Sequence, residues 1–166
     1  FVTPSSFIGQ GTFVPAATNL PAALASVTNL SLNEWLANPA VGGLDWIELF
    51  NRSSNAPVAL RGLYLGTSNA VSRIHPLSFV PPRGYAQLFA AELPGSDQLE
   101  FKLPATGGAI VLSDPAAIEL QRVIYGVQTE NVSQGRLPDG AAILASFAGS
   151  VSPGASNYVL AYTGPV

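Results

Sequence analysis

The stretch Asp45-Trp46-Ile47-Glu48-Leu49-Phe50-Asn51 interleaves polar and apolar residues, as expected of a strand whose two faces meet different surroundings. A cluster of turn-forming residues, 52–57, follows it directly. The stretch therefore predicts a strand that runs into a loop. Its central acid, Glu48, is the first candidate for a functional side chain.

Short apolar runs continue on both sides of this stretch, and 16 glycines and 14 prolines separate them. Long runs with helical periodicity are missing. We expect strands at residues 30–35, 46–50, 58–60, 63–65, 73–75, 85–90, 99–103, 109–113, 118–125 and 143–147. Regular spacing of short strands predicts an all-β fold, either an antiparallel sandwich or a barrel.

The longest apolar run, residues 141–148, is interrupted by Ser146. It falls well short of the ~18 residues that a membrane-spanning helix needs. We therefore predict a core strand there and no membrane span.

The chain divides by charge into an N-terminal extension, residues 1–29, and a domain, residues 30–166. The extension contains no Asp, Glu, Lys, Arg or His. An apolar tail of this length must be covered in water. We expect either an extra edge strand on its own sheet or a strand donated to a neighbouring molecule. Within the tail, a short helix at residues 20–27, capped by Asn19, is an equal alternative to an extended chain.

The domain as a whole is poor in charge. Hydrophobic residues make up 48% of the chain and charged residues 10%, against about 25% charged in an average domain. Two interpretations follow: a neutral secreted domain, or a subunit whose surface is covered by copies of itself or by neighbouring domains.

The few, scattered basic residues and the absence of cysteine exclude several classes of function. Lys102 is the single lysine, and the six arginines are scattered, so nucleic-acid binding is not expected. The absence of cysteine excludes disulfides and cysteine metal sites. The chain begins at Phe1 and has no methionine, so we expect a processed chain or a fragment.

Seven segments in a fixed order resemble one family. Asp45–Asn51 is similar to the "D-W-I-E-L-Y-N" segment of the lamin tail domain in its bacterial extracellular branch. Residues 133–140 resemble "S-x-G-R-x-P-D-G", and residues 152–157 resemble the closing "T-P-G-x-x-N". The other matching segments are residues 32–39, 58–65, 80–85 and 101–114.

The resemblance covers residues 31–157 and implies an immunoglobulin-like β-sandwich without catalytic activity. Members are modules of secreted or surface proteins, or the globular tail of nuclear lamins. Arg61 and Ala109 depart from the family pattern, and residues 1–30 lie outside it. The basic surface that DNA contact would require is absent, so we do not expect a nuclear role.

Few residues are candidates for chemistry. His75 is the only histidine, and no G-x-S-x-G motif accompanies it, so we expect a loop histidine and no catalytic triad. Glu34 and Glu48, on neighbouring predicted strands, are the one acid pair that could serve a glycosidase. We instead expect Glu48 to be structural, accepting hydrogen bonds from backbone amides or from Arg136.

No calcium-loop motif is present, and Asp114 and Asp139 are expected in turns. We therefore assign no catalytic, cofactor-binding or metal-binding residues.

The glycosylation pattern N-x-[ST] occurs at Asn29, Asn51 and Asn131. A sugar-stacking platform is conceivable from five aromatic residues: Trp35, Trp46, Phe50, Tyr64 and Tyr85.

Two functions remain open. The first is a non-enzymatic extracellular structural or adhesion module that self-assembles, with the N-terminal tail adding a strand to a neighbour. The second is a module that binds carbohydrate or a surface ligand as part of a larger secreted protein. Burial of both tryptophans would count against the second.

Overall fold

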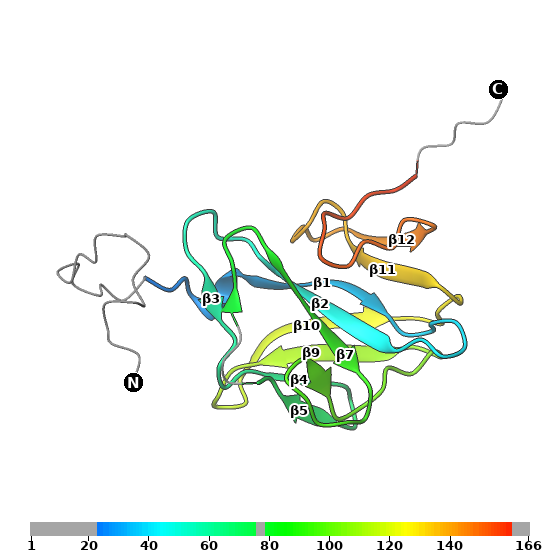
Figure 1. Cartoon of the computed structure of the whole chain (residues 1–166), viewed down its shortest axis with the longest axis horizontal. Helices are drawn as coiled ribbons and strands as arrows, with labels where there is room; N and C mark the ends of the chain where they lie inside the picture. Colours follow the sequence, from blue (N-terminus) through cyan, green and yellow to red (C-terminus); the bar gives the residue numbers. More distant parts are fainter. Residues whose placement is uncertain (1–22, 76–78, 161–166) are drawn as a thin grey trace, which may run out of the picture.

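The computed structural model describes residues 23–75 and 79–160. They form twelve short strands and one 3-10 turn, most of the strands being labelled in Figure 1. In chain order these are η2 (Val27–Asn29), β1 (Leu30–Leu36), β2 (Asp45–Asn51), β3 (Val58–Ala59), β4 (Tyr64–Gly66), β5 (Val71–Arg73), β6 (Phe79–Val80), β7 (Tyr85–Ala90), β8 (Gln98–Leu99), β9 (Gly108–Ser113), β10 (Glu119–Tyr125), β11 (Val132–Arg136) and β12 (Leu144–Ala148).

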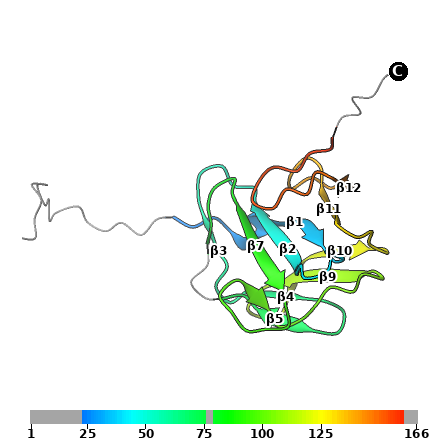
Figure 2. The same cartoon turned by 45° about the vertical axis from the view of Figure 1, so that its right-hand side comes forward.

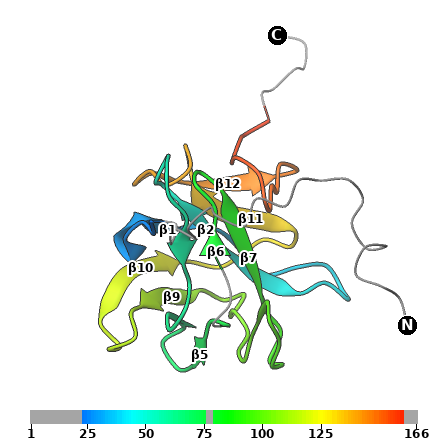
Figure 3. The ribbon, with the colours of Figure 1, turned by 60° about the vertical axis from the view of Figure 1, so that its left-hand side comes forward.

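The strands form two stacked sheets. The large sheet has the order β12-β11-β1-β2-β7-β8, and the small sheet has the order β10-β9-β4-β5. All pairings are antiparallel except that of β7 with β8. A separate ribbon joins β3 and β6. Figure 3 shows the small sheet below the large one, and the prediction of an all-β sandwich is confirmed.

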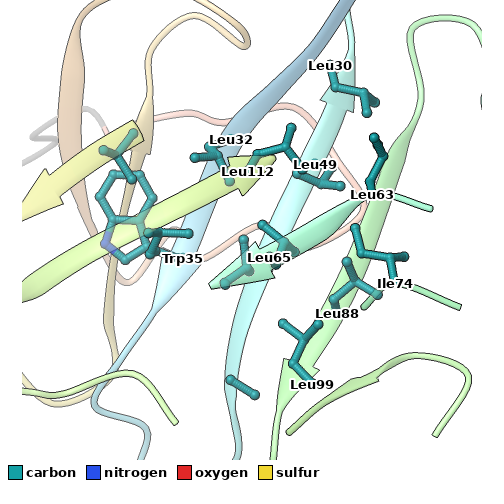
Figure 4. Close-up of a cluster of buried hydrophobic side chains, with 14 of the residues drawn as sticks. Leu30, Leu32, Trp35, Leu49, Leu63, Leu65, Ile74, Leu88, Leu99 and Leu112 are labelled. Atoms are coloured by element: carbon teal, nitrogen blue, oxygen red, sulfur yellow. The ribbon is translucent and has the colours of Figure 1, made fainter. Parts of the chain in front are cut away.

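The core fills the space between the two sheets (Figure 4). Leu32 of β1 and Leu49 of β2 face Leu65 and Leu112 of the small sheet, and all four are fully buried. Trp35 lies beside them and is also fully buried. Each such side chain contributes roughly 1.5–3 kcal/mol through burial. Hydrophobic burial between the sheets therefore accounts for the fold without any disulfide.

Most predicted strands are present, with shifted ends. Tyr85–Ala90 matches the prediction, whereas β8 is much shorter than the predicted strand at residues 99–103. β6 and β11 were not predicted. β11 is polar and contains Gly135, so it lacks the apolar pattern of a strand. It forms because β1 and β12 pair with it on both sides.

The prediction of a core strand at residues 143–147 is wrong in its placement. β12 lies at the edge of the large sheet, and of its five residues only Phe147 is buried. Leu144 is 45% exposed. An apolar run of this length does not reveal whether a strand is central or at an edge.

The predicted N-terminal extension is described only from residue 23. Residues 1–22, including most of the alternative helix, lie outside the described residues; residues 23–26 are not helical. From Ala25 onward the chain packs on the sandwich: Ala25 N donates to Pro57 O at 2.9 Å, and Ser26 caps η2. No helix among the described residues is long and apolar enough to cross a membrane.

Candidate functional site

The acid pair singled out from the sequence comes together on the outer face of the large sheet. Glu34 of β1 lies directly opposite Glu48 of β2 in the register. A register shift between Leu32 and Glu34 makes this possible. Residues two apart in a regular strand share a face; the shift lets Leu32 and Trp35 both face the core while Glu34 turns away from it.

Both carboxylates are fully buried, and donors from the protein occupy their oxygens. Glu34 Oε1 accepts from Ser133 Oγ and from Ser152 N at 3.3 Å. Glu48 accepts from Asn33 Nδ2 at 3.0 Å and from Gly154 N at 2.6 Å. The expectation that Glu48 accepts a hydrogen bond from a backbone amide is therefore confirmed.

A third acid, Asp139, completes the cluster. Asn33 Nδ2 bridges Glu48 and Asp139 Oδ1, the latter at 3.0 Å. Asp139 Oδ2 accepts from Tyr85 OH at 2.8 Å, and Oδ1 also accepts from Asn157 N at 3.1 Å. The sequence predicted Asp139 only as a turn residue, since its partners are far away along the chain.

Burial is the largest influence on the pKa values of Glu34 and Glu48. It raises the pKa of Glu34 above its ordinary value and that of Glu48 to about 7. The negative charges of Glu34 and Asp139 add to the rise at Glu48, and its hydrogen bonds from Gly154 and Asn33 offset it only in part. Glu34 and Glu48 therefore hold a proton more tightly than free carboxylates do.

The predicted contact between Glu48 and Arg136 is wrong. Arg136 donates to two backbone carbonyls, Leu32 O at 2.7 Å and Ala141 O at 2.5 Å. Burial lowers the pKa of Arg136. The ion pairs of Lys102 with Glu92 and of Arg122 with Glu119 involve none of the three acids. The acids are thus stabilised by neutral donors.

Several of these donors belong to one segment, residues 150–157, which we call the strap. It follows β12 and crosses the large sheet on the side away from the small sheet (Figure 2). Ser152 contacts Glu34, Gly154 contacts Glu48, and Asn157 contacts Asp139. The strap has no strand pairing, so these side-chain contacts fasten it to the sheet. The acids therefore attach the strap and present no free oxygen to a substrate.

A small cavity of about 270 Å³ lies beside this cluster. Phe50 and Tyr85 pack against each other at its wall, with ring centroids 5.0 Å apart and planes tilted by 32°, and the Arg83 guanidinium lies 5.5 Å from the Phe50 ring centroid. Tyr85 OH is already hydrogen-bonded to Asp139 and Ser156. Tyr85, Asp139 and Ser156 of this cavity are therefore engaged with one another, while Arg83 donates to Arg52 O at 3.4 Å.

The other residues considered for catalysis or sugar binding lie apart from the acid cluster or are buried. His75 is exposed just after β5 and lines a different cavity of about 510 Å³ with Arg73 and Glu100. Trp35 and Trp46 are both buried, so neither offers a stacking surface to a sugar. In the part of the chain that the structure describes, no three acidic or histidine side chains are arranged to hold a metal ion.

The three glycosylation patterns also differ in accessibility. Asn51 is fully buried, and its amide donates to the carbonyls of Ala56, Val80 and Pro81. Asn131 is exposed and Asn29 is half-buried. A folded chain could therefore not accept a glycan at Asn51.

Comparisons with known proteins leave the chain without a match: no family model, curated protein or solved structure is similar to it. The resemblance to the lamin tail domain stays a prediction.

Proposed function

We propose that this chain is a non-enzymatic structural or adhesion module of the cell exterior that self-assembles through its N-terminal tail. The observation that carries the proposal is the exposed apolar surface of the described residues. Ile124 is 74% exposed, Val127 78% and Ile143 69%. With charged residues at only 10% of the chain, such a surface favours contact with other protein surfaces.

The acid cluster supports the non-enzymatic part of the proposal. A glycosidase needs two carboxyl groups facing a sugar, one of them free to donate a proton. Glu34 and Glu48 are fully buried and bonded to the strap. Their raised pKa values arise from burial beneath the strap and require no catalytic role.

The alternative, carbohydrate binding, loses its main support. The two tryptophans of the conceivable platform are buried. Phe50 is buried as well, beneath Arg83. We therefore favour assembly.

Deleting residues 1–22 tests the proposal. The cut falls before Ala25 because residues 25–29 bind the sandwich: Arg52 N, for example, donates to Asn29 O at 2.9 Å. We expect the full chain to sediment as a multimer and the shortened chain as a monomer. A shortened chain that assembles as well as the full one, or a full chain that is monomeric throughout a concentration series, contradicts the proposal.

A further inference from the structure

The strand edges of the described residues differ in how well they are protected against pairing. An exposed edge offers unpaired backbone groups to another chain, and proteins protect edges by shortness, charge, proline or bulges. β8 has two residues and β5 has three, ending in the exposed Arg73. β3 and β6 have two residues each. None of these offers a long template.

β10 is longer but carries several protections. A register shift interrupts it between Glu119 and Gln121, and Glu119 forms an ion pair with Arg122 on its surface. Its Gln121 side chain also bonds to the β1 backbone, accepting from Leu32 N at 2.9 Å and donating to Leu30 O at 2.7 Å. The edge of β10 is therefore bent, charged and partly occupied.

β12 has none of these protections. Its five residues pair with β11 in unbroken register, from Leu144 opposite Arg136 to Ala148 opposite Val132. The surrounding sequence, residues 141–149, contains no charged residue and no proline. Among the described residues, no backbone hydrogen bond reaches β12 from the side away from β11. β12 is thus a regular, uncharged and unpaired edge.

A pocket of about 410 Å³, lined by aliphatic side chains and two arginines, lies at the start of this edge. Leu144 of β12 and Ile124 of β10 line it, and they are 45% and 74% exposed. Arg122 and Arg136 also line it, but Arg122 is paired with Glu119, and Arg136 donates to backbone carbonyls. An occupant therefore needs apolar side chains and no charge.

The N-terminal tail contains a segment with these properties. Residues 5–14, Ser-Ser-Phe-Ile-Gly-Gln-Gly-Thr-Phe-Val, are uncharged and lie between Pro4 and Pro15. Proline has no N–H to donate to a strand ladder. These ten residues are therefore the longest proline-free stretch before the sandwich that could add a strand to another molecule. In an extended conformation Phe7 and Phe13 share one face, and either ring could enter an apolar pocket.

The reach of the tail favours the β12 edge of a neighbouring copy over the β12 edge of the same chain. The described chain begins on the side of the molecule opposite β12 (Figures 1 and 2). The eight residues from 15 to 22 can span at most about 28 Å. A domain of this size is roughly 35 Å across, so the segment reaches the β12 edge of another molecule more readily than its own.

We propose that β12 is the acceptor edge for residues 5–14 of a second copy, with the pocket beside Leu144 receiving a phenylalanine of the donor. This inference rests on the proposed function and specifies its contact. Repeated head to tail, the donor of each molecule pairs with the acceptor of the next, so the interface is heterologous and builds open chains.

Two pairs of matched variants test the contact. Leu144→Lys places a charge on the acceptor edge, and Val71→Lys places the same charge on the edge strand β5, where Val71 is 66% exposed. Phe13→Asp charges the donor segment, and Phe1→Asp charges the tail outside it. We expect Leu144→Lys and Phe13→Asp to reduce the sedimenting mass to that of the 17.2 kDa monomer. The two controls should assemble like the original chain.

A mixing experiment then isolates donor and acceptor. The chain lacking residues 1–22 keeps only the acceptor, and Leu144→Lys keeps only the donor. Each should be monomeric alone, and an equimolar mixture should form a 1:1 dimer. Leu144 lies at the surface, so we expect Leu144→Lys to fold. Circular dichroism of each variant checks that it is folded.

The outcomes separate the two proposals. If deletion of residues 1–22 leaves assembly unchanged, the proposed function fails. If deletion gives a monomer but Leu144→Lys still assembles, or the mixture forms no dimer, the tail acts at another surface and the assignment of β12 is overturned. Monomers from both variants and a dimer on mixing support it.

Discussion

Glu48 shows at the level of one residue how a buried acid can be structural. Its neighbours on the outer face of the large sheet provide no cation, and its oxygens are satisfied by Asn33 and by the Gly154 amide. A buried carboxylate without a cation is costly when ionised. The protein reduces this cost in part by holding a proton there at a higher pH than usual, which makes folding stability depend on pH.

The direction of this dependence follows from the shift. The folded-state pKa of Glu48, about 7, lies above the ordinary value of 4.5. Below pH 4.5 both states are protonated. As pH rises toward 7, the unfolded state loses its proton first, so the free energy of unfolding falls, by an amount on the order of 3 kcal/mol. Glu34, also raised by burial, acts in the same direction.

We therefore expect the melting temperature to fall between about pH 5 and pH 8, as measured by calorimetry over a pH series. Glu48→Gln removes the titrating group and should flatten this decline, although it lowers stability at pH 5 by about 1–3 kcal/mol through a lost acceptor. Glu130→Gln, at an exposed position, should leave the slope unchanged. An unaltered slope in Glu48→Gln would show that Glu48 does not carry it.

At the level of elements, β11 depends on a glycine. A Cβ at Gly135 would lie 2.3 Å from Asn33 O and 2.9 Å from Glu34 Cα, both backbone atoms of β1. No side chain fits there without moving a strand. The close approach of β11 to β1 is what brings Ser133 to Glu34.

Gly135→Ala should accordingly destabilise the fold by about 1–3 kcal/mol, the usual cost of overpacking. Gly126→Ala is the matched control, because nothing lies within 4 Å of its added Cβ. Chemical denaturation of the two variants makes the comparison. Equal stability of both would mean that β11 can shift away from β1 without loss.

At the level of the whole molecule, the assembly that we propose joins uncharged surfaces. Neither residues 1–22 nor residues 141–149 contain a charged side chain. Salt screens contacts between exposed charges, whereas backbone hydrogen bonds and apolar contacts persist.

We therefore expect the sedimenting mass of the full chain to stay constant between about 0.05 and 0.5 M NaCl, conditions that shorten the Debye length several-fold. Sodium sulfate, which strengthens apolar contacts, should increase it. Dissociation by NaCl would show that scattered ion pairs hold the assembly, and the strand-addition contact would be wrong.

Local pattern was enough to predict the β class and most strands. Alternation within Asp45–Asn51 already separates a core face from an outer face. Tyr85–Ala90 was predicted with its bounds because the turn-forming residues 81–84 directly precede it. These properties depend on neighbours along the chain, which a sequence displays directly.

Only the tertiary structure decided what lies against each face and edge. Glu34 and Ser152 are 118 positions apart, and Asn33 and Asp139 are 106 apart; no local pattern encodes such pairs. β11 was missed because its pairing with β1 and β12, and not its own composition, makes it a strand. The apolar run at β12 predicted a strand correctly, but its place at an open edge follows from the order of strands in the sheet.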